Sequence, residues 1–114
     1  MAEGKAEFPE SEGCLTTVVL VFSDRWTPLI VDALSQGQSR FCRLQEAVGN
    51  VNPRTLSVRL VRLEREGIVT KTIVSNQPPR TEYELTTKGL ALLPIIDAMK
   101  TWSTRWPRGS EQGE

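Results

Sequence analysis

The chain has 114 residues and carries fourteen basic and fourteen acidic side chains, so its formal net charge is zero. This length suits one domain with a modest core, and the longest apolar run, residues 18–22, is far too short to cross a membrane. The sequence contains no histidine, which excludes catalytic triads built on histidine and metal sites with histidine ligands.

The N-terminal residues 1–12 are polar and acidic, and we expect them to form a flexible tail. They lack the apolar stretch of a signal peptide, and two cysteines make no disulfide framework, so cytoplasmic residence is the simplest expectation. The following segment, residues 15–22, is rich enough in β-branched side chains to form a strand, but a helix is also compatible with its pattern.

A helix is predicted over residues 26–34, because apolar side chains recur there with helical spacing. Ser23 or Asp24 is placed to cap its first turn. A second, short helix is predicted over residues 43–48, and residues 49–50 form the turn that follows it.

The segment from Asn52 to Gly67 carries the clearest helical signals of the chain. Asn52 is a favourable N-cap, Pro53 falls at the first helical position, and Gly67 is placed to end the helix. Leucines spaced i, i+4 and i+7 share one face: Leu56, Leu60 and Leu63. The opposite face carries Arg54, Val58, Val61 and Arg65, and one flank carries Thr55, Arg59 and Arg62. Taken alone, this pattern favours an ordinary amphipathic helix with a solvated charged face.

The segment after this helix changes that interpretation. Two strands are predicted, residues 68–74 and 81–85, around the polar turn 75–80. A basic helix followed by a basic two-stranded wing is the arrangement of a winged helix-turn-helix, in which the helix enters the DNA major groove and the wing lies along the backbone.

The last predicted helix begins at Thr86 or Thr87 and runs to about Trp102 or Trp106, and Pro94 should kink or split it. Its apolar stripe consists of Leu90, Leu93, Ile96 (or Ile95), Met99 and Trp102. A winged-helix core covers only part of this stripe and of the apolar N-terminal segment. We therefore expect a homodimer that buries the remainder.

The zero net charge conceals an uneven distribution. Residues 1–37 carry two basic and six acidic side chains, a net charge of −4. Residues 38–88 carry nine basic and five acidic side chains, a net charge of +4, and residues 89–114 are neutral. Positive charge is thus concentrated on the predicted DNA-binding elements, and the local field is what a phosphate backbone experiences.

Four groups of residues occur in order and at fixed spacing. They are Asp24-Arg25-Trp26-Thr27, Arg40-Phe41-x-x-Leu44, Asn52-Pro53-Arg54-x-Leu56-x-x-Arg59-Leu60-x-x-Leu63-x-x-x-Gly67, and Pro78-Pro79-Arg80-x-x-Tyr83-x-Leu85-Thr86-x-x-Gly89. With these motifs, residues 14–102 resemble the HxlR-type winged-helix transcriptional regulators. The resemblance implies a mainly α fold with a small β-wing (α+β), in a domain spanning residues 13–106 between tails 1–12 and 107–114.

Members of that family are small bacterial-type homodimers that bind pseudo-palindromic operators, so the resemblance implies double-stranded DNA and a second copy of the chain as partners. It makes residues 52–66 the recognition helix and Arg80 the arginine of the wing, near the minor groove or its phosphates. Arg40 would contact the backbone. The residues expected at the DNA are Arg40, Asn52, Arg54, Thr55, Val58, Arg59, Arg62 and Arg80.

The resemblance also bears on the two cysteines. Cys14 stands where many members carry a cysteine at the start of the first helix, and some of those members use it to sense oxidants or electrophiles. Here Leu15 follows Cys14, whereas the family pattern often continues with proline. Cys42 is the second candidate thiol, and the alternative is that both cysteines are small, partly buried hydrophobes.

Two other classes of function are alternatives to DNA binding. A winged helix can be a protein-interaction module, but its groove face should then be neutral or acidic, whereas residues 38–88 carry a net charge of +4. An enzyme is not expected, because the acidic residues show no paired arrangement and no nucleophile comes with a base. We expect no cofactor, no metal and no membrane partner, and the sequence identifies no small-molecule effector.

Overall fold

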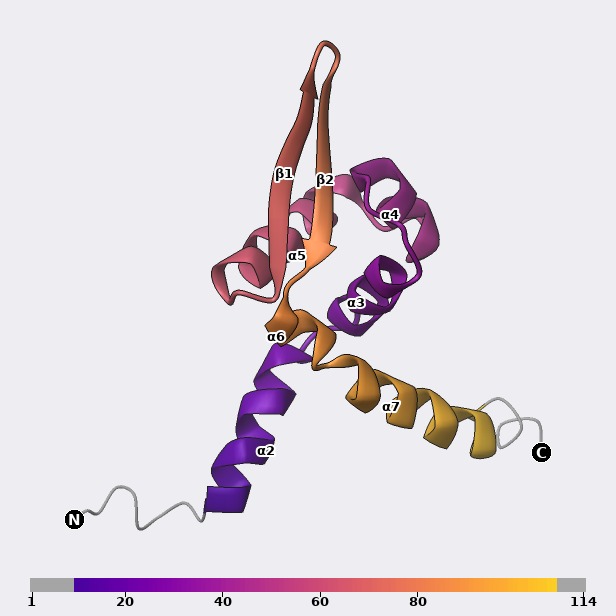
Figure 1. Ribbon diagram of the computed structural model, residues 1–114. Helices are drawn as coiled ribbons and strands as arrows, with labels where there is room; N and C mark the ends of the chain where they lie inside the picture. The colour runs from indigo at the N-terminus through magenta and orange to yellow at the C-terminus, as the bar shows by residue number, and fades with distance from the viewer. Residues whose placement is uncertain (1–9, 109–114) are drawn as a thin grey trace.

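The structure is a computed structural model that describes residues 10–108. Its elements are helices α2 (Glu10–Val21), α3 (Thr27–Ser35), α4 (Phe41–Ala47) and α5 (Pro53–Arg65), strands β1 (Val69–Asn76) and β2 (Pro79–Leu85), and helices α6 (Thr87–Leu90) and α7 (Leu93–Arg105). The hairpin projects as a wing from a body of helices, while α2 and α7 run away on the side opposite the wing tip (Figure 1). This is the predicted winged helix-turn-helix. Residues 10–12 of the predicted N-terminal tail instead begin α2, and the rest of that tail and most of the predicted tail 107–114 lie outside the described range.

Helix α2 settles the open choice between helix and strand for residues 15–22. Apolar side chains recur in this segment at i, i+3, i+4 and i+7, which suits one face of a helix. The sheet described is a two-stranded hairpin, so a strand here would have no described partner. Val21 and Phe22, at the end of α2, pack against the core, whereas Leu15 and Val19 are 66% and 62% exposed.

Helices α4 and α5 form the helix-turn-helix, and the turn between them lies at Gly49 and Asn50 as predicted. Both residues have positive φ angles, 97° and 58°, which glycine and asparagine adopt more readily than other residues. The Gln45 side chain closes the turn by donating to the Val51 carbonyl oxygen over 2.9 Å. Helix α4 begins at Phe41, two residues earlier than predicted. The sequence did not indicate this start, because no side chain caps the helix there.

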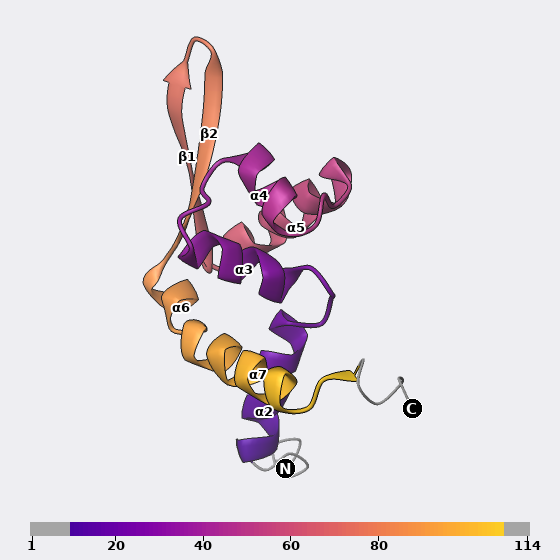
Figure 2. The same ribbon diagram turned by 90° about the vertical axis from the view of Figure 1, so that its right-hand side faces the viewer.

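One apolar core joins the body to the base of the wing. Helix α3 lies between α4 and α5 on one side and α6 and α7 on the other (Figure 2). The core is made of buried aliphatic side chains from every one of these layers: Ile30, Val31, Ala33, Leu44, Val48, Val51, Leu56, Leu60, Leu63, Ile68, Val69 and Ile96. The leucine face predicted for α5 is thus confirmed as the face that holds the helix to the body.

The strands of the wing pair antiparallel and extend further than predicted. Only residues 77–78 of the predicted turn 75–80 remain between them. Pro79 does not interrupt β2, because it stands at the first position of the strand, where proline is tolerated. At the base of the wing the Tyr83 N–H donates to the Ser39 carbonyl oxygen over 2.8 Å, which ties β2 to the connection between α3 and α4.

Thr86 links the wing to the C-terminal helices. Its hydroxyl oxygen accepts from the Gly89 N–H at 3.1 Å, which caps α6, and its hydroxyl donates to the Gly67 carbonyl oxygen at 2.5 Å. Gly89 is buried, and a Cβ there would collide with the Ile68 carbonyl oxygen. The predicted helix is split into α6 and α7, and Pro94 stands in the first turn of α7, where its missing N–H costs little.

Helix α7 buries one side and exposes the other. Ile96 is buried, and Lys100 Nζ lies 2.8 Å from Asp32 Oδ1, so both residues join α7 to α3. Trp102 and Trp106 are 63% and 55% exposed. No helix within residues 10–108 combines the length and the apolar character needed to span a bilayer.

The packing of α5 predicts a sharp contrast between neighbouring residues. Replacing Leu60 with alanine should lower the free energy of unfolding by about 3 kcal/mol, since its side chain is 1% exposed and would leave a cavity. Val61, which is 45% exposed, is the matched control, and Val61→Ala should cost less than about 1 kcal/mol. Urea denaturation measures both values, and equal losses would show that the core has been assigned to the wrong face.

Candidate nucleic-acid interface

The N-terminal half of α5 is fixed at its start and open on its outer face. The Asn52 carboxamide oxygen accepts hydrogen bonds from the Arg54 N–H at 2.8 Å and the Thr55 N–H at 3.4 Å, so the predicted N-cap is confirmed. Arg54 is exposed, and Val58, one turn further along, is 53% exposed. This half of the helix therefore offers a cation and an apolar side chain to whatever approaches it.

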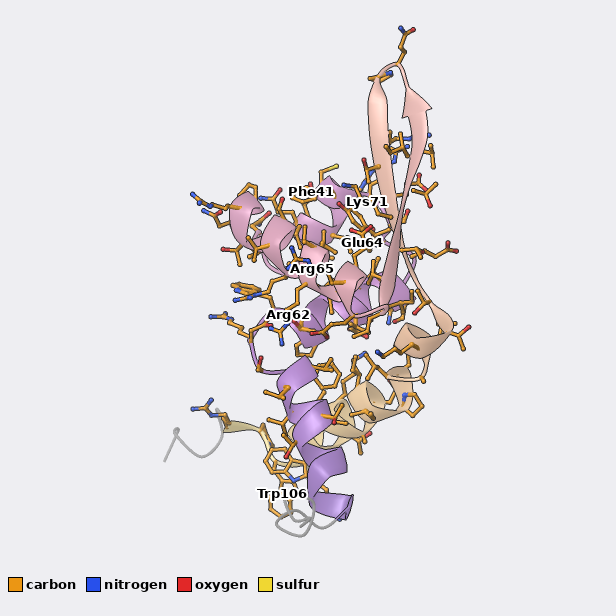
Figure 3. The ribbon with its side chains drawn as sticks, turned by 90° about the vertical axis from the view of Figure 1, so that its left-hand side faces the viewer. Phe41, Arg62, Glu64, Arg65, Lys71 and Trp106 are labelled. Atoms are coloured by element: carbon orange, nitrogen blue, oxygen red, sulfur yellow. The ribbon has the colours of Figure 1, made fainter. Side chains whose placement is uncertain are left out.

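Two arginines on the flank of α5 turn toward Asp24. Arg59 Nε lies 3.6 Å from Asp24 Oδ1, and Arg62 Nη1 lies 3.8 Å from Asp24 Oδ2. Arg62 also donates to the Leu20 carbonyl oxygen over 2.6 Å and lies 3.3 Å from Glu66 Oε2. Figure 3 shows Arg62 at the junction of α5 with α2. In this structure Arg62 therefore holds α5 against the end of α2.

Asp24 is kept ionised by the groups around it. Its Oδ1 accepts from the N–H groups of Trp26 and Thr27 at 2.7 and 2.8 Å, and its Oδ2 accepts from the Thr27 hydroxyl at 2.6 Å. Burial raises the pKa of Asp24, but these hydrogen bonds and the Arg59 guanidinium together bring it below its ordinary value. One carboxylate thus accepts the N–H of Thr27, the first residue of α3, and also pairs with α5, although the N-cap position is Trp26 and not Ser23 or Asp24 as predicted.

The C-terminal end of α5 is held by Lys88, the second residue of α6. Lys88 Nζ donates to the Glu66 carbonyl oxygen over 2.8 Å. A cation at this end of a helix also suits the helix dipole. Glu64 and Lys71 lie where this part of α5 meets the wing (Figure 3), so the C-terminal half of α5 is surrounded by protein on more than one side.

The two arginines predicted outside the recognition helix are brought together by one acid. Arg40 Nε lies 3.9 Å and Arg80 Nε 4.0 Å from Glu82 Oε2, and all three side chains are partly exposed. Sequence reasoning found both arginines but missed Glu82. A signal was available, because residues i and i+2 of a strand share a face, which places Glu82 beside Arg80.

The two cysteines lie in different helices, and Cys14 is not at the start of its helix as the resemblance implied, because α2 begins at Glu10. Cys42 is exposed in the first turn of α4. Cys14 belongs to α2, but its side chain lies outside what the structure describes. Within the described part of the chain, no cluster of three or more cysteine, aspartate or glutamate side chains could hold a metal ion.

The family model described as HxlR-like helix-turn-helix matches residues 21–111. The chain belongs to this family. The HTH-type transcriptional regulator YvaP of Bacillus subtilis is 41% identical to this HxlR-like protein over 99 residues, which cover 85% of this chain and 92% of YvaP. The HTH-type transcriptional regulator YodB of the same organism is 32% identical over 82 residues, which cover 72% of this chain and 73% of YodB.

Solved structures agree with this assignment. The redox regulator HypR in its reduced form has a TM-score of 0.78 and 28% identity to this chain, and the match covers 86% of this chain and 97% of HypR. The reduced form of the transcriptional regulator YodB from B. subtilis has a TM-score of 0.70 and 28% identity, over 82% and 92% of the two chains. The family resemblance and the winged-helix fold predicted from the sequence are both confirmed.

The environment of Asp24 predicts an acid-sensitive contribution to stability. Because its pKa is lowered by folding, Asp24 stabilises the protein above the pKa of the unfolded chain, and this stabilisation is lost as the pH falls through the lower pKa of the folded state. Asp24→Asn should lower the free energy of unfolding at pH 7 by about 1–2 kcal/mol and flatten its decline between about pH 5 and pH 2.

Chemical denaturation at several pH values measures this difference. Asp32→Asn is the control, because it removes a surface ion pair with Lys100 and should cost less than about 1 kcal/mol. A variant at Asp24 with an unchanged pH profile would contradict the assigned role of its carboxylate.

Proposed function

We propose that this HxlR-like protein is a transcriptional regulator that binds a pseudo-palindromic operator in double-stranded DNA as a homodimer. DNA binding is the function that the family and the geometry support together. The observation that carries it is the exposed, arginine-bearing outer face of α5 beside a wing whose Arg80 shares Glu82 with Arg40. Such a protein works where the genome lies, which for a bacterial-type regulator is the cytoplasm.

In this proposal six of the eight DNA-contacting residues fall into two groups. Asn52, Arg54, Thr55 and Val58 approach the base edges, since the N-terminal half of α5 is the open half. Arg40 and Arg80 hold phosphates, because they lie together beside Glu82, Arg40 directly before α4 and Arg80 on the wing, outside the recognition helix. Arg59 lies between the two groups. Arg62 reaches DNA only after releasing the Leu20 carbonyl oxygen, so its main role is to orient α5.

The homodimer rests on the apolar surfaces of α2 and α7. Leu15, Val19, Trp102 and Trp106 are each more than half exposed. The Cα radius of gyration is 17.0 Å, whereas a compact domain of about 100 residues has roughly 13 Å, because α2 and α7 extend away from the body. Packing these helices across a two-fold axis would bury their apolar faces and orient two recognition helices toward one duplex.

A winged helix that binds only protein is the competing class, and binding to mixed-sequence DNA distinguishes the two. A DNA-binding protein should bind it at low salt and release it as the salt concentration rises, because bound cations displace counterions from the phosphates. No binding even at low salt would favour the protein-interaction module. Selection of bound duplexes from a random pool then identifies the operator.

The dimer predicts a solution mass of about twice the 12.8 kDa of the chain at micromolar concentration. Val19→Glu should shift the mass toward that of the monomer, because it places a charge in the apolar interface. Ile73→Glu makes the same kind of change on the wing, where Ile73 is 64% exposed, and should leave the mass unchanged. Light scattering measures all three proteins, and a monomeric wild type would rule out the proposed dimer.

The division between phosphate and base contacts predicts different effects of arginine substitutions. Arg40→Ala and Arg80→Ala should weaken binding to all sequences, and each should make the dependence of log affinity on log salt shallower by about one unit. Arg54→Ala should instead change the preferred sequence, at a cost of about 1–3 kcal/mol against the wild-type operator.

Arg108→Ala is the control for lost charge, since Arg108 is exposed beyond α7. Fluorescence anisotropy at several salt concentrations gives the slopes. Unchanged affinity in all of the α5 and wing variants would show that the groove has been assigned to the wrong face.

A thiol signal is the second candidate property. It is supported by the match to HypR, a redox regulator also solved in its oxidised form, and to YodB, also solved after diamide treatment. We propose Cys14 as the sensing residue, because it lies in α2, which belongs to the proposed dimer interface. Half-sites lie about 34 Å apart, so a small shift at the interface displaces both recognition helices.

This candidate predicts that diamide lowers operator affinity about tenfold in the wild type and in Cys42→Ser, but not in Cys14→Ser. Anisotropy with and without diamide measures the effect. The reverse pattern would move the role to Cys42, which is exposed beside the helix-turn-helix. Equal affinity in the wild type under both conditions would leave both cysteines as packing residues.

A further inference from the structure

The outer face of α5 carries an apolar pair between two cations. Val58 and Val61 are 53% and 45% exposed, and both lie on the side opposite the buried leucines. Arg54 precedes them by one turn, Arg65 follows them by one turn, and both arginines are exposed. Single exposed valines are common on protein surfaces, but these two are adjacent, and Val58 belongs to the face proposed to enter the major groove.

We infer that Val58 and Val61 determine part of the operator sequence by contacting the 5-methyl groups of thymines. This inference rests on the proposed DNA-binding function and names thymine as the nucleobase that these two side chains recognise. The thymine methyl is the apolar group that the major groove presents on base edges, and apolar side chains recognise it by contact. Valine carries no side-chain hydrogen-bond donor or acceptor, so the polar atoms of the other base edges offer it no comparable partner.

The shape of the helix surface supports this contact. Val58 lies between two shallow hollows, one beside Arg54 and Thr55 and the other beside Ser57 and Val61. A methyl group that enters either hollow meets the valine and the alkyl part of its neighbours, which removes apolar surface of both molecules from water.

The spacing of the two valines also suits neighbouring bases. Residues three positions apart advance about 4.5 Å along a helix axis, and successive base pairs are about 3.4 Å apart. Val58 and Val61 would therefore meet adjacent base pairs when α5 lies along the groove. The expected half-site contains one thymine opposite Val58 and a second thymine at the neighbouring pair.

The test shortens each partner in turn: deoxyuridine in place of thymine removes one methyl group from the DNA, and alanine in place of valine removes both γ-methyl groups from the protein. A duplex selected from a random pool by the wild-type protein is synthesised with each thymine replaced singly by deoxyuridine, which keeps the base pair and lacks only the methyl group. At the thymine that contacts Val58, this replacement should lower wild-type affinity about fourfold, because one methyl-sized group is no longer buried. Val58→Ala should show the same reduced affinity on the thymine duplex and no further loss on the deoxyuridine duplex.

Val61→Ala should lose sensitivity at the neighbouring thymine in the same way. Leu29→Ala, which truncates an apolar side chain on α3 that is 43% exposed, is the control and should keep the full sensitivity of the wild type. Thermal unfolding of each variant should match the wild type, since the replaced side chains lie at the surface.

Three outcomes separate the inference from the function on which it rests. If Val58→Ala and Val61→Ala keep the full loss of affinity on replacement of thymine by deoxyuridine, that loss comes from a change in DNA shape, and the inference is overturned. A selected duplex that binds equally well with thymine and deoxyuridine would also overturn it, while DNA binding would stand. If no duplex is enriched over the random pool, sequence-specific binding and the inference fail together.

Discussion

The carboxylate of Asp24 lies where three helices meet, and the orientation of the recognition helix depends on it. Its oxygens accept the hydrogen bonds that begin α3, and the same oxygens face Arg59 and Arg62 of α5. A mostly buried carboxylate is costly unless it is paired, and here both a helix start and two guanidinium groups compensate for its burial. The angle between α3 and α5 therefore has an electrostatic component in addition to the leucine packing.

The same cluster connects the recognition helix to the proposed dimer interface. Arg62 bonds to a backbone carbonyl in the last turn of α2, whose exposed apolar side chains are those proposed to meet a second copy. A rotation of α2 would therefore act on α5 through a charged hydrogen bond as well as through Val21 and Phe22, which pack on the core. In the proposed dimer, the packing of α2 and the orientation of α5 would therefore be coupled through Arg62.

Local signals account for what could be predicted from the sequence. The start of α5 was predictable, because Asn52, Pro53 and the leucine spacing lie within one short stretch. The partners of Arg62 were not, since one of them, the Leu20 carbonyl, lies 42 positions away and only the fold brings the two together. Glu82 was overlooked for a similar reason, because its pairing with Arg40 depends on β2 lying against the loop before α4. The choice between helix and strand for residues 15–22 could not be made from the sequence, because the apolar side chains of α2 do not all pack on the core of one chain and so show no clear buried face.

The hydrogen bond from Lys88 to the end of α5 limits the length of helix that can contact base edges. Arg62 bonds to α2 and the Glu66 carbonyl oxygen accepts from Lys88, so residues 53–61 are the stretch of α5 that we propose enters a groove. That stretch is about 13 Å long, the length of roughly four base pairs. One subunit can therefore recognise only a short base sequence, and a sequence of this length occurs many times in a genome. In the proposed dimer, selectivity would come from two such short sequences at a fixed separation, so the rigidity of the dimer interface would contribute to sequence recognition.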